Sequence, residues 1–167
     1  AVAILDPGIK IDPEYAVYQD GLRDDVFLKY PDGKLVKAPV WPGNCHFPDF
    51  TCAKTRAWWA ERVAALAQVG FAGLWNDMNE PAVLTFQRGA TLPDYVVHDW
   101  DSASQTHAGG GHNVYGTQMA RATREGLQKQ NPDKRPFVLT RALYAGAQRY
   151  TSAWTGDNGA TWDHLRL

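Results

Sequence analysis

Charged side chains stand just after four short apolar runs of the sequence. They are Asp6 after Ala-Ile-Leu, Asp77 after Gly-Leu-Trp-Asn, Arg141 after Val-Leu-Thr and Asp157 after Trp-Thr-Gly. A single aspartate after a strand is more often a turn former or a helix cap than a catalytic group. Four such positions in succession, however, are typical of an active site built at the carboxyl ends of several strands.

The chemistry that these groups offer is carboxylate chemistry. Two carboxyl groups in different environments can serve as nucleophile and proton donor on opposite sides of one sugar. Asp77 and Asp157 are the candidates, and closure of a barrel would bring them together although they are far apart in the sequence. Arg141 would lower the pKa of the nucleophile by favouring its anion. The acid needs a drier pocket, which Trp154 would help to provide.

Aromatic side chains adjoin the same loops and are suited to pack against the apolar face of a sugar ring. These are Trp41, Trp75 and Trp154. Other tryptophans are expected to be packing residues, namely Trp58, Trp59 and Trp162.

Glu80 and three histidines also invite a functional interpretation. Glu80 precedes a proline and is interpreted as a cap or a supporting hydrogen-bond acceptor rather than as the nucleophile. His98, His107 and His112 are irregularly spaced in a segment rich in glycine. Surface or supporting roles are therefore favoured over a metal site for these histidines.

Apolar runs and helical periodicity predict the elements that position these groups. We expect strands at 2–5, 71–75, 136–140 and 150–154, helices at 54–69 and 113–129, and a helical turn at 143–148. Asn113 is expected to cap the second helix, and Asn131-Pro132 to end it. The segments 12–49 and 85–111 have no sustained period and are expected to be long irregular insertions of the kind that often carry function.

The alternation of strands and helices favours parallel strands with right-handed crossovers. A small doubly wound sheet fits the length, whereas an α/β barrel takes about 250 residues and would be only about half complete. Ionic groups after four successive strands favour the barrel, because an open sheet binds ligands at one switch point. No glycine-rich phosphate loop follows a strand, which weakens a nucleotide-binding interpretation.

Composition argues against several classes of partner. Lys and Arg total 17 against 18 Asp and Glu, and no basic run is present, so a nucleic-acid partner is not expected. No apolar stretch has the roughly 20 residues of a membrane span, and no targeting segment is visible, which favours the cytoplasm. The missing initiator Met leads us to expect a piece of a longer chain, whose oligomeric state no pattern reveals. Cys45 and Cys52 are expected to be reduced thiols rather than a bridge.

Several longer motifs follow one another along the chain. They are Leu5-Asp6-Pro7-Gly8-Ile9, Val40-Trp41-Pro42-Gly43, Phe47-Pro48-Asp49-Phe50-Thr51, Trp75-Asn76-Asp77-Met78-Asn79-Glu80-Pro81, His112-Asn113-Val114-Tyr115-Gly116, Arg135-Pro136-Phe137-Val138-Leu139 leading to Arg141, and Trp154-Thr155-Gly156-Asp157-Asn158 with Trp162-Asp163-His164-Leu165. In this order they resemble glycoside hydrolase family 31, the α-glucosidase group, and the likeness covers essentially the whole chain.

This resemblance implies a fold and a set of roles. The fold would be a partial (β/α)8 TIM barrel, about strands three to six, with long βα loops. Asp77 would be the catalytic nucleophile and Asp157 the general acid/base of a retaining exo-hydrolysis of α-glucosides by the full-length parent. The subsite for the non-reducing-end sugar would be lined by Asp6, Trp41, Trp75, Met78, Arg141 and Trp154. No metal or organic cofactor is implied.

Two departures from the family pattern stand out. Gly109-Gly110-Gly111 replaces the acidic–apolar pair that usually precedes the His-Asn-x-Tyr-Gly motif. The strands expected before Asp6 and after Leu167, and the accessory β-domains, are absent, so we expect residues 1–167 to be a fragment of one catalytic barrel domain. Such a fragment would be inactive and poorly folded alone, because strand edges and an apolar interior are exposed.

Other functions remain compatible with the same motifs. A transglucosylase or an α-glucan lyase would use the same nucleophile but exclude water from the second step. A non-catalytic carbohydrate-binding relative belongs to another class and is disfavoured, since both Asp77 and Asp157 are present.

Overall fold

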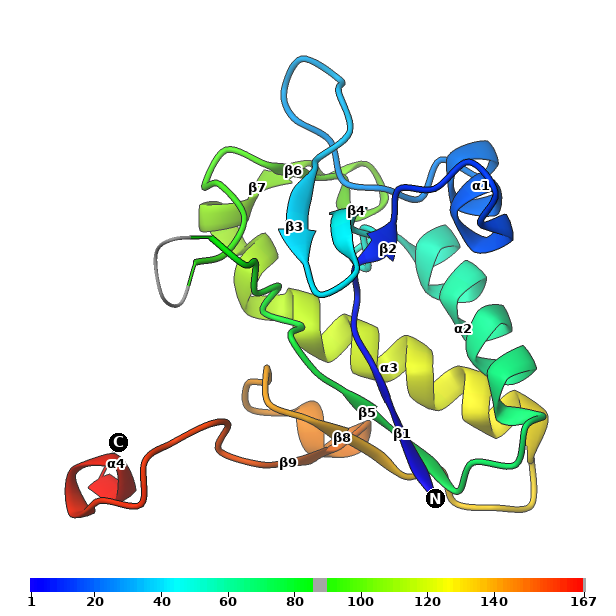
Figure 1. Cartoon of the computed structure of the whole chain (residues 1–167), viewed down its shortest axis with the longest axis vertical. Coiled ribbons are helices and arrows are strands. Elements are labelled where there is room, and N and C mark those ends of the chain that lie inside the picture. Colours follow the sequence, from blue (N-terminus) through cyan, green and yellow to red (C-terminus); the bar gives the residue numbers. More distant parts are fainter. Residues whose placement is uncertain (86–89, 167) are drawn as a thin grey trace.

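The centre of the fold is a parallel sheet, seen in a computed structural model that describes residues 1–85 and 90–166. Its strands, in spatial order, are β1 (Val2–Leu5), β5 (Gly73–Asn76), β8 (Val138–Thr140) and β9 (Ser152–Ala153). Within this sheet, β1 pairs in parallel with β5, β5 with β8, and β8 with β9 (Figure 1). The predicted strands and their parallel arrangement are therefore confirmed, with boundaries that differ by at most a few residues.

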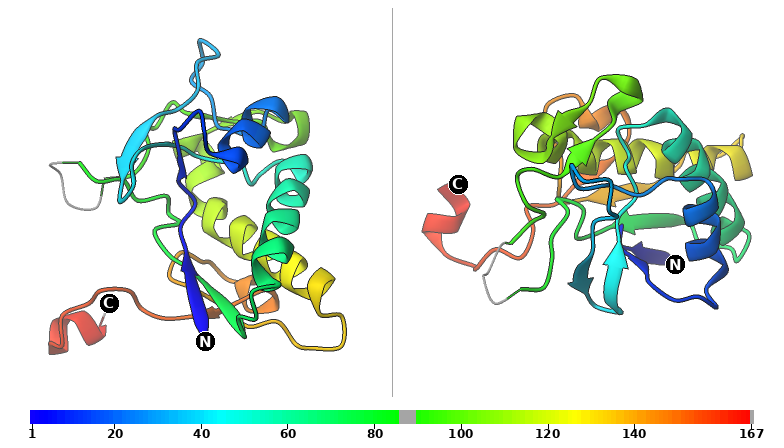
Figure 2. Two further views of the ribbon diagram at one scale, coloured as in Figure 1. Left: turned by 45° about the vertical axis from the view of Figure 1, so that its right-hand side comes forward. Right: turned by 90° about the horizontal axis from the view of Figure 1, so that it is seen from above.

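Two helices cover one face of this sheet and pack along each other (Figures 1 and 2). They are α2 (Ala53–Ala67) and α3 (His112–Gln130). The Trp59 indole is buried between them and donates a hydrogen bond of 2.9 Å to the Thr123 hydroxyl. Gly126 permits the close approach, because a Cβ there would collide with the Ala60 carbonyl oxygen. Both predicted helices, and the packing roles of Trp58 and Trp59, are confirmed.

The opposite face of the sheet is open. Ile4 on this face is 55% exposed, and its neighbour across the sheet is Trp75. In a complete α/β barrel the corresponding face points into the barrel interior. Within the described residues the sheet does not close, and its form is that of a barrel segment.

The connection from β1 to α2 forms a folded layer above the carboxyl edge of the sheet. It contains β2 (Ile9–Lys10), α1 (Ala16–Arg23), β3 (Ala38–Val40) and β4 (Gly43–His46), with antiparallel order β2-β4-β3. The prediction of an irregular segment at 12–49 is therefore wrong. The strands have two to four residues and α1 has only eight, which is too short for a periodic signal. Buried Phe27, Leu28 and Phe47 hold this layer together.

The connection from β5 to α3 is a second folded segment. It contains β6 (Val97–His98), η1 (Trp100–Ser102), β7 (Gln105–Thr106) and the π-helical turn η2 (His107–Gly111). Part of the predicted irregular stretch, residues 86–89, lies outside the described residues. The turn continues directly into α3, so the predicted cap at Asn113 is wrong. Instead the Thr106 hydroxyl accepts a hydrogen bond of 3.0 Å from the Gly109 amide, whereas α3 ends at Asn131 as predicted.

Beyond β9 the chain extends away from the sheet and ends in α4 (Trp162–Arg166) (Figure 1). The short helix η3 (Ala147–Arg149) lies between β8 and β9. Trp162 is 77% exposed, so its predicted packing role is not seen. Cys45 and Cys52 are both buried free thiols, as expected. No helix in the described ranges has the length and apolar character needed to cross a membrane.

Candidate active site

Arg141 gathers carboxylates at the carboxyl edge of the sheet. It follows β8, and its guanidinium binds both Glu80 oxygens, with Nε 2.8 Å from Oε1 and Nη2 3.2 Å from Oε2. Arg141 Nε also lies 3.3 Å from Asp77 Oδ1, and Nη1 lies 3.2 Å from Asp157 Oδ2. A bidentate pair of this kind fixes the plane of the guanidinium as well as its position. Groups that follow β5, β8 and β9 therefore meet at a single cation.

Asp77 and Asp157 differ in their surroundings although they share this cation. The Asp77 side chain is 16% exposed, whereas that of Asp157 is 88% exposed. Because both carboxylates contact the same guanidinium group, their separation is limited to the width of that group plus the two ion-pair contacts of 3.3 and 3.2 Å. Trp154 does not dehydrate Asp157 in this structure, so the expected dry pocket around the acid is absent here.

Asp6 lies beside Asp77 because β1 and β5 are neighbours in register. The Leu5–Asn76 pair ends the ladder, and the Asp77 amide donates to the Leu5 carbonyl oxygen at 3.4 Å. The pKa of Asp6 is raised to about 6, chiefly by burial and also by repulsion from the Asp77 carboxylate, while Arg141 acts in the opposite direction. Asp6 Oδ1 is buried and has no hydrogen-bond partner in the described part of the chain. Such an atom is available to a ligand hydroxyl group.

Aromatic rings line the same edge from two strands. Trp75 and Trp154 meet edge to face, with ring centroids 5.1 Å apart and an interplanar angle of 86°. The Trp75 Nε1 atom is buried and lacks a partner among residues 1–85 and 90–166. Trp41 stands at the turn between β3 and β4 and is 71% exposed, with no ring contact to these two indoles in the described structure. The structure thus joins two of the three predicted aromatic residues.

The loop after β5 has a constrained backbone. Met78 is buried and has a φ of +51°, in the left-handed region that costs a residue with a side chain roughly 1 to 2 kcal/mol. Its carbonyl oxygen accepts a hydrogen bond of 3.0 Å from the Ala82 amide. Asn79 is fully buried, and its amide nitrogen lies 2.8 Å from the Thr140 hydroxyl on β8. These contacts fix the loop that carries Asp77 against the neighbouring strand.

Most residues of this edge are predictable from the sequence, but the contact of Glu80 with Arg141 is not. Its interpretation as a supporting acceptor is compatible with the structure, yet nothing in the sequence reveals that both its oxygens hold Arg141. The usable signal was its position three residues after Asp77. Asn79 was not singled out at all, although its burial and bond to Thr140 tie the loop in place.

The histidines differ from the surface roles considered for them. His98 and His107 are buried, with exposed fractions of 0% and 1%. His112 packs edge to face against His107, with ring centroids 5.0 Å apart. In the part of the chain that the structure describes, no group of three or more His, Cys, Asp or Glu residues is arranged to hold a metal ion.

The family model for the glycosyl hydrolases family 31 TIM-barrel domain matches residues 1–167. The chain belongs to glycoside hydrolase family 31. Its fold is therefore a segment of the family 31 barrel, as the sequence motifs indicated. The open parallel sheet and its charged carboxyl edge agree with this assignment.

Curated family 31 relatives are considerably longer than this chain. It is 49% identical over 166 residues to alpha-glucosidase 2 of Bacillus thermoamyloliquefaciens, covering 99% of this chain and 21% of that protein. It is 40% identical over 171 residues to human neutral alpha-glucosidase AB, covering 99% of this chain and 18% of that protein. The chain thus spans about a fifth of the length of these relatives.

Solved family 31 structures superpose on the chain with similar coverage. The glucosidase II alpha subunit with DNJ bound matches with a TM-score of 0.85 and 36% identity over 98% of this chain and 18% of that one. The family 31 alpha-glucosidase from Bacteroides thetaiotaomicron matches with a TM-score of 0.76 and 42% identity over 99% of this chain and 26% of that one.

Proposed function

We propose that the intact protein is a retaining, exo-acting α-glucosidase that removes terminal non-reducing glucose from α-glucosides. Residues 1–167 would form about strands three to six of one (β/α)8 catalytic domain, with the other strands and accessory β-domains outside this sequence. The α-glucosidases among the similar proteins support the substrate class. The observation that carries the proposal is the contact of Arg141 with both Asp77 and Asp157.

The proposed reaction has two steps at the anomeric carbon. Asp77 attacks this carbon while Asp157 gives its proton to the departing glycosidic oxygen, which leaves a covalent glucosyl-aspartate. Asp157 then removes a proton from water, and the resulting hydroxide displaces Asp77 and releases glucose. Carboxylates alone perform both steps, so the proposed reaction needs no metal or organic cofactor.

Arg141 has a defined part in this proposal. Its ion pair with Asp77, with Nε 3.3 Å from Oδ1, holds the attacking carboxylate in place. Its Nη1 lies 3.2 Å from Asp157 Oδ2, whereas a proton donor must turn toward the glycosidic oxygen. Binding of substrate should therefore separate Asp157 from the guanidinium and cover its exposed side chain. The sugar subsite would be completed by Asp6, Trp41, Trp75, Met78 and Trp154.

Product analysis tests the proposal. The intact protein is incubated with maltose, and the products are followed by proton NMR from the first minutes. Because maltose also releases its reducing-end glucose as a mixture of anomers, retaining hydrolysis predicts an early excess of the α-anomer over the anomer ratio of the starting maltose. An early excess of the β-anomer contradicts retention. Longer oligosaccharides would indicate a transglucosylase, and an unsaturated anhydro-sugar would indicate a lyase.

A further inference from the structure

A chain of buried polar groups runs beneath the loops at the carboxyl edge. His98 Nδ1 lies 3.5 Å from Asp49 Oδ1, and His98 Nε2 lies 2.9 Å from His107 Nδ1. His107 Nε2 lies 3.1 Å from the Thr91 hydroxyl, which donates a bond of 2.7 Å to the Pro81 carbonyl oxygen. We name these five residues the histidine chain. It begins just before α2 and ends next to Glu80.

The order of protons along the histidine chain follows from its two ends. The Pro81 carbonyl oxygen can only accept, so the single hydroxyl proton of Thr91 points toward it. His107 must then donate from Nε2 to Thr91, which leaves Nδ1 of a neutral ring as the acceptor for His98 Nε2–H. His98 Nδ1 makes no hydrogen bond among the described residues but faces Asp49 Oδ1 at ion-pair distance, where a bare nitrogen would set its lone pair against a carboxylate oxygen. A proton on both His98 nitrogens removes this conflict.

The surroundings of His107 keep that ring neutral. The pKa of His107 is lowered to about 3, chiefly by burial and also by the neighbouring His98 and His112. The His98 and His107 rings are stacked with centroids 5.2 Å apart. The Tyr115 ring meets His98 edge to face and brings no charge. The proton between the two rings is therefore the Nε2–H of His98, donated to His107 Nδ1.

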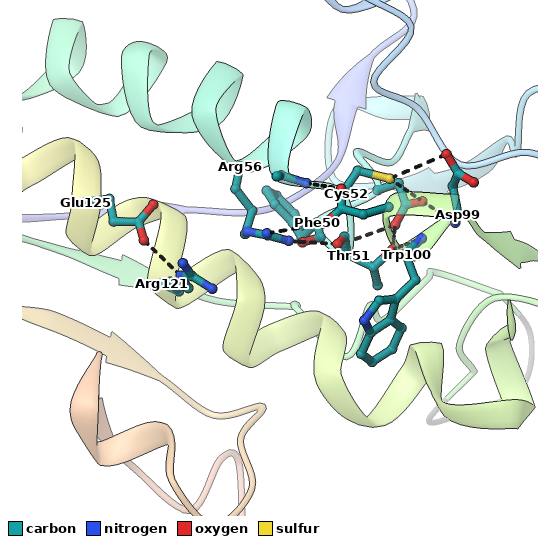
Figure 3. Close-up of polar contacts among 11 residues, drawn as sticks. Phe50, Thr51, Cys52, Arg56, Asp99, Trp100, Arg121 and Glu125 are labelled. Carbon is teal, nitrogen blue, oxygen red and sulfur yellow. Dashed lines mark hydrogen bonds and ion pairs between the residues drawn. The ribbon is translucent and has the colours of Figure 1, made fainter. Parts of the chain in front are cut away.

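The surroundings of Asp49 keep that group ionised. Burial would raise the pKa of Asp49, but hydrogen bonds from His98, the Thr51 hydroxyl and the Asp99 amide, together with positive charge on His98, bring it below its usual value. The Thr51 hydroxyl is 2.6 Å from Oδ1, and the Asp99 amide is 2.7 Å from Oδ2. The Cys52 thiol lies 3.4 Å from Asp49 Oδ2 and 4.0 Å from Asp99 Oδ2, and Figure 3 shows the contact with Asp99. A buried carboxylate of this kind needs a nearby cation, and His98 supplies it.

The far end of the histidine chain is next to the catalytic carboxylates. Pro81 directly follows Glu80, and Glu80 holds Arg141 by two bonds. Arg141 in turn contacts Asp77 and Asp157. A shift of the Pro81 carbonyl therefore moves Glu80 and, through the guanidinium, both carboxylates.

We propose that the histidine chain is a positioning device for the catalytic carboxylates, with His98 as a buried imidazolium and the Thr91 hydroxyl as the contact that fixes the Glu80-Pro81 segment. The inference rests on the proposed function, because its kinetic effect is on turnover of the α-glucoside. Its protonation pattern can be measured without any turnover. Thr91 and His98 act through other groups and are positioning residues.

Thr91 offers a kinetic test in the intact protein. Thr91→Val keeps the shape of the side chain but removes the bond to Pro81, and kcat for maltose should fall about tenfold with KM within about twofold. Thr91→Ser restores the hydroxyl and should return kcat to within about threefold of the original value. A matched control is Thr117→Val. Thr117 is 2% exposed, and its hydroxyl has no partner in the described ranges, so kcat should not change.

Two results would overturn the positioning role. One is an unchanged kcat in Thr91→Val, and the other is a loss that Thr91→Ser does not restore. Neutron diffraction of the intact protein tests the charge separately, with deuterium expected on both His98 nitrogens and on Nε2 alone of His107. A bare His98 Nδ1 would overturn the assignment. Absence of glucosidase activity in the unaltered protein would refute the proposed function. The neutron map would still show whether His98 carries two protons.

Discussion

The carboxyl edge and the histidine chain are both polar, but they are organised in opposite ways. At the edge, buried atoms such as Asp6 Oδ1 and Trp75 Nε1 have no partner in the described structure, and the Asp157 side chain is 88% exposed. In the histidine chain, Asp49 uses both carboxylate oxygens, and each His107 nitrogen has a partner. Buried polar groups are normally hydrogen-bonded. The edge therefore leaves polar atoms open to a ligand, whereas in the described part of the histidine chain only His98 Nδ1 lacks a hydrogen bond, and it faces Asp49 Oδ1 at 3.5 Å.

This difference separates the expected effects of substitution. At the edge, Asp77 and Asp157 share one cation, and Asp6 Oδ1 and Trp75 Nε1 have no hydrogen-bond partner in the described structure. Substitutions there should therefore affect turnover more than stability. Groups in the histidine chain are desolvated and linked to one another, so loss of one member leaves its neighbours unsatisfied. The segment Glu80-Pro81 joins the two regions.

Asp77→Asn should have the largest effect. The amide cannot form the glucosyl ester, so kcat for maltose should fall by about 10⁴-fold or more. Binding of maltose, measured by titration calorimetry, should persist because the subsite is unchanged. Turnover at the original rate would show that Asp77 is not the nucleophile and would contradict the proposal that the edge is an active site.

Asp49→Asn should weaken the fold rather than the chemistry. The substituted amide lacks the negative charge that balances His98, and it turns an N–H group toward groups that are already donors. The free energy of unfolding should fall by about 2 to 4 kcal/mol. Thermal unfolding should show a clearly lowered midpoint. The control is Asp99→Asn, since the Asp99 side chain is exposed and its backbone amide still reaches Asp49. Equal midpoints for both variants would contradict the difference between the two regions.

Glu80→Gln tests the segment that joins the two regions. Loss of the charge loosens Arg141, and kcat should fall about 10-fold to 100-fold. Glu125→Gln is the matched control, because Glu125 pairs with Arg121 on the exposed surface of α3 (Figure 3). That pair should contribute little, and kcat should stay within about twofold. Similar losses in both variants would show that Glu80 has no special link to the site.

The smallest expected change in stability is that of Asp6→Asn, and it should be visible in the pH dependence of unfolding. The folded-state pKa of Asp6 is raised from 3.8 to about 6, so the folded state binds this proton more tightly than the unfolded state does. Protonation therefore stabilises the fold as pH falls from about 6 toward 3.8, and this gain is lost as pH rises through 6.

The comparison for Asp6 is between two pH profiles of the melting temperature. The original protein should gain about 1 to 3 °C over the variant on going from pH 7 to pH 4. Parallel profiles for the two proteins would show that burial does not perturb Asp6.

The sequence was most informative where local patterns and tertiary structure agree. The strand that ends at Asn76 and the helix Ala53–Ala67 follow from apolar runs and from the spacing of Trp59, Val63 and Leu66. The positions after the strands predicted that Asp77, Arg141 and Asp157 meet, and the ion pairs agree with this. Parallel strands necessarily bring their carboxyl ends to one edge.

Other features depend on contacts that no local pattern contains. Helix α1 has no side-chain cap and is held by packing of its buried Tyr18 against Phe27. The π-helical turn at His107–Gly111 arises where the glycine run approaches His98. The pairing of His98 with His107 joins β6 to this turn, so irregular spacing in the sequence concealed a regular contact in the fold.

Trapping of the covalent intermediate tests the central claim most directly. The intact protein is treated with a fluorinated glucosyl fluoride that forms the intermediate faster than water removes it, and its peptides are analysed by mass spectrometry. The predicted result is one glucosyl adduct on the peptide that contains Asp77, at the side chain of that residue. An adduct on another carboxylate, or turnover of maltose with inversion and no adduct at all, would contradict the account.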